Sequence, residues 1–246
     1  MTIRKVLGVI LIILGIAIFV SLITLAACRN EETHNSLASA TDGITYDIQD
    51  SAVTILNISA TDTYLTIPSY IEGIPVEKIG SQFLYQNTTC INLIFPETLE
   101  TIESAAFYRC YSLTEIEIPK SVSNIGSGAF FRCASLLNIR VDKDNAHFQD
   151  IDGVLYSKDG KVLLAYPEGR VDSFCSIPEG VTTIADDAFG YHSSLCYVYI
   201  PDSVVNFPDY NIFLFPDEIT IIASDNGAAR KYADQYGIRW QAEIPE

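Results

Sequence analysis

The stretch "IESAAFYRC", residues 102–110, returns as "IGSGAFFRC" at 125–133 and as "IADDAFGYH" at 184–192. A sequence segment that occurs three times in one chain indicates a structural repeat. Aligned on the first isoleucine of each unit, the anchors are Ile79, Ile102, Ile125 and Ile184, and the first three are 23 residues apart. A period of about 20 to 30 residues is typical of a solenoid, in which stacked units share one core.

Similar residues recur at fixed distances after each anchor. The column five positions on is large and apolar: Leu84, Phe107, Phe130 and Phe189. The columns fourteen and sixteen positions on are also apolar: Leu93, Ile116, Ile139 and Val198, then Phe95, Ile118, Val141 and Ile200. "LTEIEIP", residues 113–119, alternates apolar and polar side chains and predicts a short strand that Pro119 ends. "AAF" and "GAF" predict a compact turn or short helix that places the aromatic ring in the core.

The segment "IESAAFYRCYSLTEIEIPKSV", residues 102–122, and its partners resemble the BspA-like class of leucine-rich repeats, which occurs in surface proteins of bacteria and some protists. The resemblance covers about residues 42 to 240. It implies a leucine-rich-repeat solenoid that is β-rich, with short strands, short helical turns and a C-terminal capping helix. His192 departs from the usual cysteine of its column, and Leu84 follows Phe83 where the family has Ala-Phe.

The repeat domain is expected over 42–246, with a cap at about 219–246. In the cap, one helix face carries Ala229, Tyr232, Ala233 and Tyr236, and Gly237 ends the helix. Because Ile125 and Ile184 are 59 residues apart, a hairpin insert is expected at about 142–176. Asp159-Gly160 between two apolar runs is the turn signal of that hairpin.

The N-terminus predicts export and anchoring. No residue from Val6 to Ala27 is charged, and Arg4 and Lys5 precede this run. "LAAC", residues 25–28, resembles the lipobox of bacterial lipoproteins, which implies a signal peptide at 1–27 and lipidation of Cys28. The alternative is an uncleaved transmembrane helix, since the run is long enough to span a bilayer. Either anchor places the protein outside the cytoplasm, and polar residues 28–41 form a flexible tether.

Charge and cysteine content exclude several classes of function. Without residues 1–27, 13 Lys and Arg face 31 Asp and Glu, and such an acidic chain repels nucleic acid. The remaining cysteines show no zinc-binding spacing and are interpreted as small buried residues: Cys90, Cys110, Cys133, Cys175 and Cys196. Residues 142–153 hold several oxygen donors, but His147 stands where a calcium loop needs glycine. We therefore expect no cofactor and no metal.

No catalytic motif occurs in the chain. A pairing of Cys133 with His192 is conceivable, since both occupy one column, but nothing activates it. A pocket with convergent ionisable groups and shifted pKa values would favour an enzyme instead.

The candidate ligand-binding residues are the strand residues that point away from the core, because the scaffold does not dictate them. They stand thirteen and fifteen positions after each anchor: Asn92 with Ile94, Glu115 with Glu117, Asn138 with Arg140, and Tyr197 with Tyr199. The two tyrosines, expected beside Asn138 and Arg140, would suit a protein or glycan. The resemblance implies an adhesion-type protein that binds proteins or glycans of host or neighbouring cells. The alternative is an envelope lipoprotein that serves a transporter or cell-wall enzyme of its own cell.

We predict that Cys28→Ala abolishes lipidation, because the thioether of a lipoprotein forms on that sulfur. Mass spectrometry of the mature N-terminus should show a lipid-modified Cys28 in the wild type and none in the variant. A wild-type chain that keeps Met1 would contradict the lipoprotein interpretation and favour the transmembrane anchor.

Overall fold

The repeat domain is a solenoid of short strands. The computed structural model describes residues 43–59, 62–190, 192, 194–213 and 218–242, and Gly43–Glu246 form one compact unit. The predicted signal peptide 1–27, the lipidation residue Cys28 and the tether 28–41 lie outside the described residues. Among the residues described, no helix is both long and apolar enough to cross a membrane.

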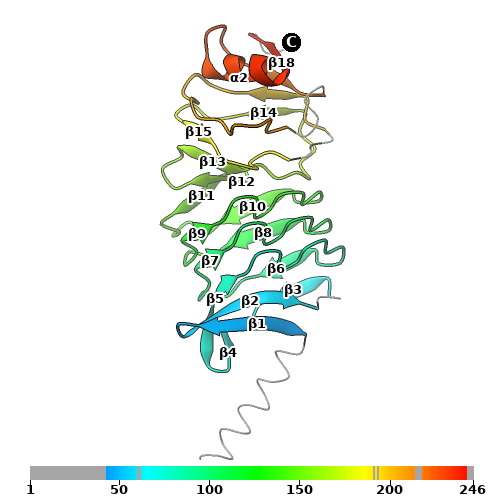
Figure 1. The fold of residues 1–246 in the computed structure, drawn as a ribbon, viewed down its shortest axis with the longest axis vertical. Coiled ribbons are helices and arrows are strands. Elements are labelled where there is room, and N and C mark those ends of the chain that lie inside the picture. The colour runs from blue at the N-terminus through cyan, green and yellow to red at the C-terminus, as the bar shows by residue number, and fades with distance from the viewer. Residues whose placement is uncertain (1–42, 60–61, 191, 193, 214–217, 243–246) are drawn as a thin grey trace, which may run out of the picture. The chain divides into compact units, whose positions relative to one another are not determined.

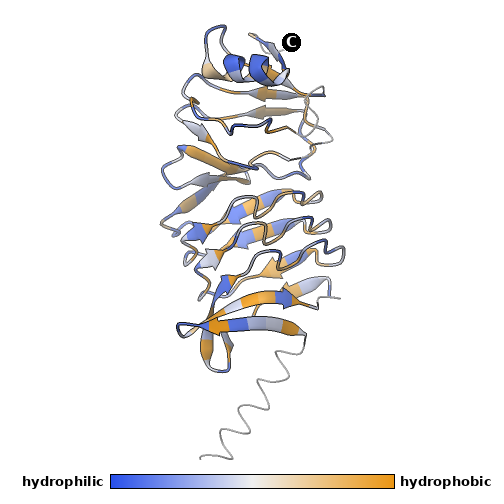
Figure 2. Ribbon diagram, viewed as in Figure 1, coloured by the Kyte–Doolittle hydropathy of each residue, from blue (hydrophilic) through white to orange (hydrophobic). Residues whose placement is uncertain are grey.

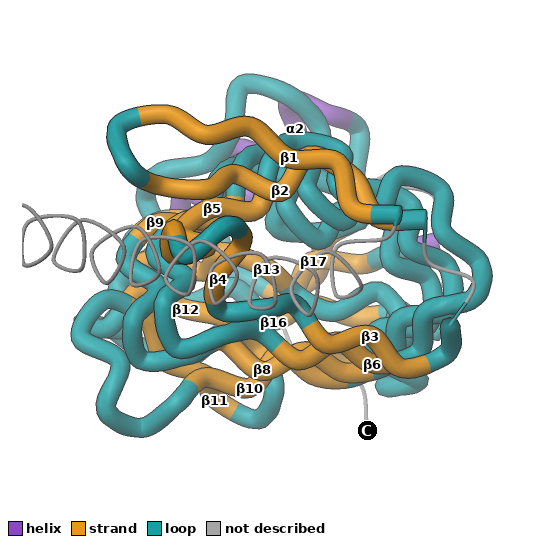
Figure 3. The backbone as a smooth tube through the Cα atoms, turned by 90° about the horizontal axis from the view of Figure 1, so that it is seen from below, coloured by secondary structure: helices purple, strands orange, loops and turns teal. Residues whose placement is uncertain are grey.

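Two ladders of strands run along the first half of the solenoid (Figure 1), and they lie on different sides of the coil in a view along the stack (Figure 3). The first sheet has the order β1-β2-β5-β7-β9, with β4 paired to β5. Its strands are β1 Ile44–Gln49, β2 Ala52–Ile58, β4 Tyr70–Ile71, β5 Ile74–Ile79, β7 Thr101–Ile102 and β9 Asn124–Ile125. The second sheet contains β3 Tyr64–Thr66, β6 Asn92–Ile94, β8 Glu115–Ile118 and β10 Asn138–Val141, all parallel.

The second half repeats this arrangement with two further sheets. One contains β11 Phe148–Ile151, β12 Val154–Ser157, β13 Val162–Ala165 and β15 Thr183–Ile184. The other is parallel throughout and contains β14 Phe174–Ser176, β16 Tyr197–Tyr199, β17 Thr220–Ile222 and β18 Arg239–Gln241. The helix of the described residues is α2, Ala228–Tyr236.

The repeat period sets the strand register. Leu93 of β6 pairs with Ile116 of β8, and Ile116 pairs with Ile139 of β10, each one repeat along the chain. All three side chains are buried, and their neighbours along the strands point outward. Figure 2 shows the resulting alternation of apolar and polar residues along β8 and β10. The predicted leucine-rich-repeat solenoid is therefore confirmed.

The aromatic column fills the inside of the coil. Phe83 meets the edge of Phe107 at 5.9 Å, and Phe130 stacks on Phe107 at 5.7 Å. The segments that carry these rings are turns rather than helices, held by bonds such as Ala106 N–H to Glu103 C=O at 3.2 Å. Bonds between coils join the same segments, as Phe107 N–H donates to Ala129 C=O at 2.8 Å.

The insert is shorter than predicted. Val154–Ser157 and Val162–Ala165 are antiparallel, so the hairpin expected at Asp159-Gly160 is confirmed. However, β13 also pairs in parallel with β15, and β14 pairs with β16. Residues from about 162 therefore form a further coil, and the expected end of the insert at 176 is wrong. Only two residues separate Leu163 from Tyr166 in this coil, where other coils have four, which hid the repeat.

Both ends of the stack are covered. At the lower end in Figure 1, β1 folds antiparallel on β2. At the upper end, the predicted capping helix is confirmed as α2: Ala229, Tyr232 and Ala233 are buried, and Gly237 ends the helix in the left-handed conformation. The Tyr232 hydroxyl accepts from Ile212 N–H at 2.8 Å, which fastens the helix to the last coil.

We predict that Ile116→Ala lowers the free energy of unfolding by about 2–5 kcal/mol, because the side chain is 1% exposed and its loss leaves a cavity. Phe130→Ala should cost a similar amount. Ile94→Ala is the matched control on the neighbouring strand, since Ile94 is 61% exposed, and its effect should stay within about 0.5 kcal/mol. Denaturant titration measures all three, and equal effects of Ile116→Ala and Ile94→Ala would contradict the assigned columns.

Candidate ligand-binding strand face

The predicted outward residues of β6, β8 and β10 form one continuous surface. Asn92, Glu115 and Asn138 lie side by side in the ladder, and the pairing of Arg140 with Glu117 aligns the second row. In each strand the residue between the two predicted positions is buried, so the alternation of the strand turns these side chains outward. We call the outer surface of β3, β6, β8 and β10 the strand face.

A groove of about 400 Å³ lies on the strand face. Four of the predicted residues line it, namely Asn92, Ile94, Glu115 and Glu117. The remaining lining residues are Leu93, Phe95, Glu97, Pro119 and Asp142. Ile94 is an exposed apolar residue of the groove, and Tyr64, 73% exposed, pairs with Asn92 from the adjacent strand β3. The groove therefore offers apolar contact area among polar side chains.

The charge of the groove is negative. Four carboxylates line it, and two of them have basic partners: Glu97 lies 3.5 Å from Lys120, and Glu115 pairs with Arg140. Both pairs are exposed, so water screens them and they stabilise the fold little. Two more acids than bases therefore remain at the groove, a charge that favours a cationic ligand.

The strand face ends at β10, where the insert covers its free edge. Ile139 N–H donates to Gly153 C=O at 2.9 Å, and Val141 N–H donates to the Asp150 carboxylate at 2.8 Å. The turn packs so closely that a Cβ on Gly153 would lie 2.4 Å from the side-chain oxygen of Asn138. The insert thus takes the position that the next parallel strand would otherwise occupy.

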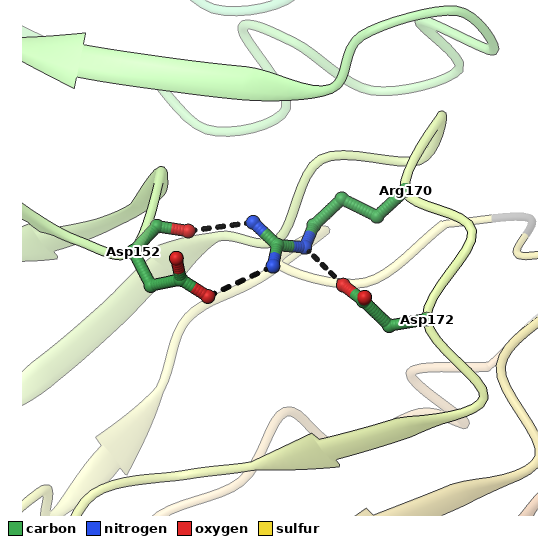
Figure 4. Close-up of polar contacts among 3 residues, drawn as sticks. All are labelled: Asp152, Arg170 and Asp172. Atoms are coloured by element: carbon green, nitrogen blue, oxygen red, sulfur yellow. Dashed lines mark hydrogen bonds and ion pairs between the residues drawn. The ribbon is translucent and has the colours of Figure 1, made fainter.

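Arg170 fastens the insert to the following coil (Figure 4). Its guanidinium donates to the backbone oxygen of Asp152 at 2.5 Å and to the Asp152 carboxylate at 2.9 Å. It also donates to Asp172 at 2.6 Å, and it lies 5.6 Å from the centre of the Tyr166 ring. The Arg170 side chain is 15% exposed, whereas the side chains of Asp152 and Asp172 are 87% and 43% exposed, so the guanidinium is shielded from water and its acidic partners are not.

The two tyrosines lie on another sheet. Tyr197 and Tyr199 belong to β16, between β14 and β17, whereas Asn138 and Arg140 end the sheet of the strand face. The expectation that the tyrosines stand beside Asn138 and Arg140 is therefore wrong, because the insert separates the two sheets. Both tyrosines are half-buried, and Tyr199 donates its hydroxyl to Glu179 at 3.1 Å.

Sequence reasoning missed Tyr64 and Phe174, which extend these two surfaces. Phe174, 38% exposed, pairs with Tyr197. Tyr64 belongs to the N-terminal coil, where a five-residue loop shifts the repeat, and Phe174 belongs to the coil hidden in the insert. Once those two coils are placed in register, the same outward position identifies both residues.

The buried cysteines and His192 are packing residues. Burial raises the pKa of Cys90 to about 11 and of Cys175 to about 12, and it raises the pKa of Cys133 well above that of a free thiol. Such thiols stay protonated and are poor nucleophiles. The interpretation as buried residues is confirmed for four cysteines and wrong for Cys196, which is exposed.

His192 fills the cysteine column with its ring against Tyr166 and Phe189, at 5.0 and 6.0 Å between ring centres. Desolvation lowers the pKa of His192 to about 4, so the ring is neutral near pH 7. Gly190 N–H donates to its Nε2 at 3.4 Å.

Side-chain amide and carboxylate groups of 142–153 form hydrogen bonds with backbone atoms. Asp142 accepts from Asp144 N–H at 2.8 Å, and Asn145 donates to Pro119 C=O at 2.8 Å and to Val122 C=O at 2.9 Å. Within the described residues, no group of three or more His, Cys, Asp or Glu side chains is placed to hold a metal.

The family model "BspA type Leucine rich repeat region" matches residues 59–153 and 172–225 in six copies. The chain belongs to this family. Leucine-rich repeats of this type are found in surface proteins and suggest a binding role. No curated protein matches the sequence.

Three solved bacterial structures are similar to the chain. A leucine-rich cell surface protein from Faecalibacterium prausnitzii is 20% identical, with a TM-score of 0.47 over 74% of this chain and 75% of that one. The pneumococcal vaccine antigen PcpA is 17% identical, with a TM-score of 0.43 over 74% and 69%. A leucine-rich repeat protein from Eubacterium ventriosum is 17% identical, with a TM-score of 0.40 over 75% and 71%.

We predict that acid destabilises the wild type more than a His192→Cys variant. The pKa of His192 is about 4 in the folded protein against 6.5 for a free side chain, so the unfolded state binds the proton more tightly. The contribution of the neutral ring is complete above pH 6.5 and is lost as the pH falls toward 4, amounting to about 2–3 kcal/mol at the low end. Urea titrations between pH 7 and 4.5 measure this difference.

His147→Cys makes the same substitution at an exposed position and is the control for the change of side chain. Parallel pH profiles of the wild type and His192→Cys would contradict the assigned burial of a neutral ring.

Proposed function

We propose that this protein is a non-catalytic binding module, anchored to the outer side of a bacterial membrane, that engages a protein partner through the groove of the strand face. The observation that carries the proposal is the groove itself. It lies on outward positions that the repeat leaves free, and it combines the exposed side chain of Ile94 with unpaired acidic groups.

The partner that fits the groove carries basic and apolar side chains in one segment. Glu117 and Asp142 form no ion pair with any described residue, so an incoming lysine or arginine could pair with Glu117 and with the oxygen of Asp142 that does not accept from Asp144. The exposed faces of Ile94 and Tyr64 supply the area that an apolar anchor residue would cover. A neutral glycan would satisfy neither the charge nor the aliphatic surface, which is why we favour a protein here.

The N-terminal sequence supports the location. The uncharged run from Val6 to Ala27 ends at Cys28 with the residues that a lipobox requires, and 28–41 would serve as the tether. Lipidation of Cys28 would supply two or three acyl chains, enough for stable anchoring. A repeat domain held in this way is presented to partners on host cells, on neighbouring cells or in the producer's own envelope.

The source of the partner distinguishes the two candidate functions, adhesion and a role in the producer's own cell surface. A partner in host matrix or mucin would make the protein an adhesin, and a partner found only in the producer's envelope would make it a subunit of its own cell surface. The full chain in mild detergent is the bait for both pools, and each captured protein is then titrated with groove variants.

We predict that the double variant Ile94→Lys/Glu117→Lys weakens binding of the captured protein roughly tenfold or more, because it removes an apolar contact and reverses a charge. Val171→Lys/Glu218→Lys makes the same two kinds of change at exposed positions outside the groove and should bind like the wild type. Surface plasmon resonance measures both. Loss of binding in Tyr197→Ala/Tyr199→Ala, with the groove double variant unaffected, would move the site to the other sheet.

A further inference from the structure

The side of the solenoid formed by the turns carries a stack of aromatic rings. Tyr85 stacks on Tyr108 with ring centres 5.7 Å apart and planes 15° apart, and Tyr108 stacks on Phe131 at 6.0 Å and 5°. The three residues occupy the same position in three successive coils, one after the inward aromatic column. Tyr85 is 43% exposed, and Tyr111 of the same side is 39% exposed, so part of the aromatic surface meets solvent.

An arginine follows the ring in two of these coils. The guanidinium carbon of Arg109 lies 5.1 Å from the centre of the Tyr108 ring, and that of Arg132 lies 5.9 Å from the Phe131 ring. Paired backbones of neighbouring coils are about 4.8 Å apart, so Arg109 and Arg132 are attached to adjacent backbone positions. We call these two arginines, with Tyr85, Tyr108 and Phe131, the aromatic–arginine ladder.

Neither arginine is neutralised within the described residues. Arg109 and Arg132 form no ion pair there, although Arg140, Arg170 and Arg230 each pair with a carboxylate. The Nε atom of each is buried and has no hydrogen-bond partner. The nearby Glu168 carboxylate accepts from the backbone N–H of Arg132 at 2.6 Å. In a chain with 31 acids and 15 bases, two adjacent unpaired arginines indicate a place for an external anion.

The two arginines share a backbone position that the repeat sets. Arg109 and Arg132 both have φ of 63°, the left-handed region that suits glycine or asparagine. Gln86 occupies the equivalent position of the preceding coil at φ 59°, so the fold accepts an uncharged residue there. The left-handed conformation at this position therefore belongs to the repeat, and a neutral residue can replace either arginine without a change of backbone.

We propose that the aromatic–arginine ladder binds an acidic glycan whose sulfate or carboxylate groups pair with Arg109 and Arg132. Guanidinium groups bind such anions through two parallel hydrogen bonds. Rings of Tyr85 and Tyr111 would pack against the C–H faces of the sugars, contacts that an acidic peptide with its carboxylates on flexible stems does not offer. This site is separate from the strand-face groove, which carries negative charge. The two proposals can therefore be tested independently.

Binding of a heparin-derived oligosaccharide, as the probe, to the full chain in detergent tests the proposal. At low salt the wild type should bind, and Arg109→Asn/Arg132→Asn should bind roughly tenfold or more weakly. Asparagine tolerates the left-handed backbone, so the double variant should keep or raise the melting temperature. Lys161→Gln/Lys231→Gln removes the same charge at exposed positions elsewhere and should bind like the wild type.

Three results would overturn the proposal. The first is no binding of the oligosaccharide by the wild type, and the second is an equal loss of affinity in the two double variants. The third is binding of poly-L-glutamate with the same affinity as the oligosaccharide and with the same loss in Arg109→Asn/Arg132→Asn. The last result would assign the ladder to an acidic polypeptide. Neutral dextran, which lacks the anion, should not bind. The groove variant Ile94→Lys/Glu117→Lys should still bind the oligosaccharide. A negative result for the groove would therefore not affect the test of the ladder.

Discussion

The structure depends on the in-register stacking of coils that cannot bury their own apolar edges. Ile116 is buried because Leu93 lies against it from the coil before and Ile139 from the coil after. Each inward side chain is thus a contact partner for two coils, which fixes the register of the strands and makes a shift of one residue costly. The same requirement leaves the first and last coils with an uncovered edge. The β1–β2 hairpin and α2 cover those edges, with Val53 and Ile55 of the hairpin and Ala229 and Ala233 of α2 buried against the core.

Because the core fixes the inward columns, chemical variety is confined to the outward positions, where two surfaces of opposite charge result. On the strand face, acids outnumber bases around Ile94. On the turns, Arg109 and Arg132 stand without carboxylate partners beside stacked rings. Since both surfaces belong to the same three coils, a rigid core holds them at a constant separation. A protein ligand and an acidic glycan could therefore bind one molecule at once without competing for charge.

Features that follow from the repeat period could be predicted from the sequence, and features that depend on a local change of length could not. The buried columns, the outward residues of β6, β8 and β10, the turn at Asp159-Gly160 and the helix ended by Gly237 each depend on a short pattern that the fold reproduces. The coil from Leu163 escaped prediction because two missing residues before Tyr166 break the alignment. The aromatic–arginine ladder was also missed, since the absence of carboxylate partners is a property of packing that no single-sequence pattern reports.

The insert changes what the solenoid can present. The Gly153 turn occupies the ladder position beside Ile139, and Arg170 holds that turn to the next coil through Asp152 and Asp172. The apolar core also divides here, with one cluster ending near Leu155 and the other beginning at Val154. An uninterrupted repeat would have joined Asn138 and Tyr197 into one long surface suited to a single extended ligand. Division at β10 instead gives a four-stranded acidic face and a separate face built on Phe174 and Tyr197. Substitutions on one face can therefore alter its ligand contacts without changing those of the other face.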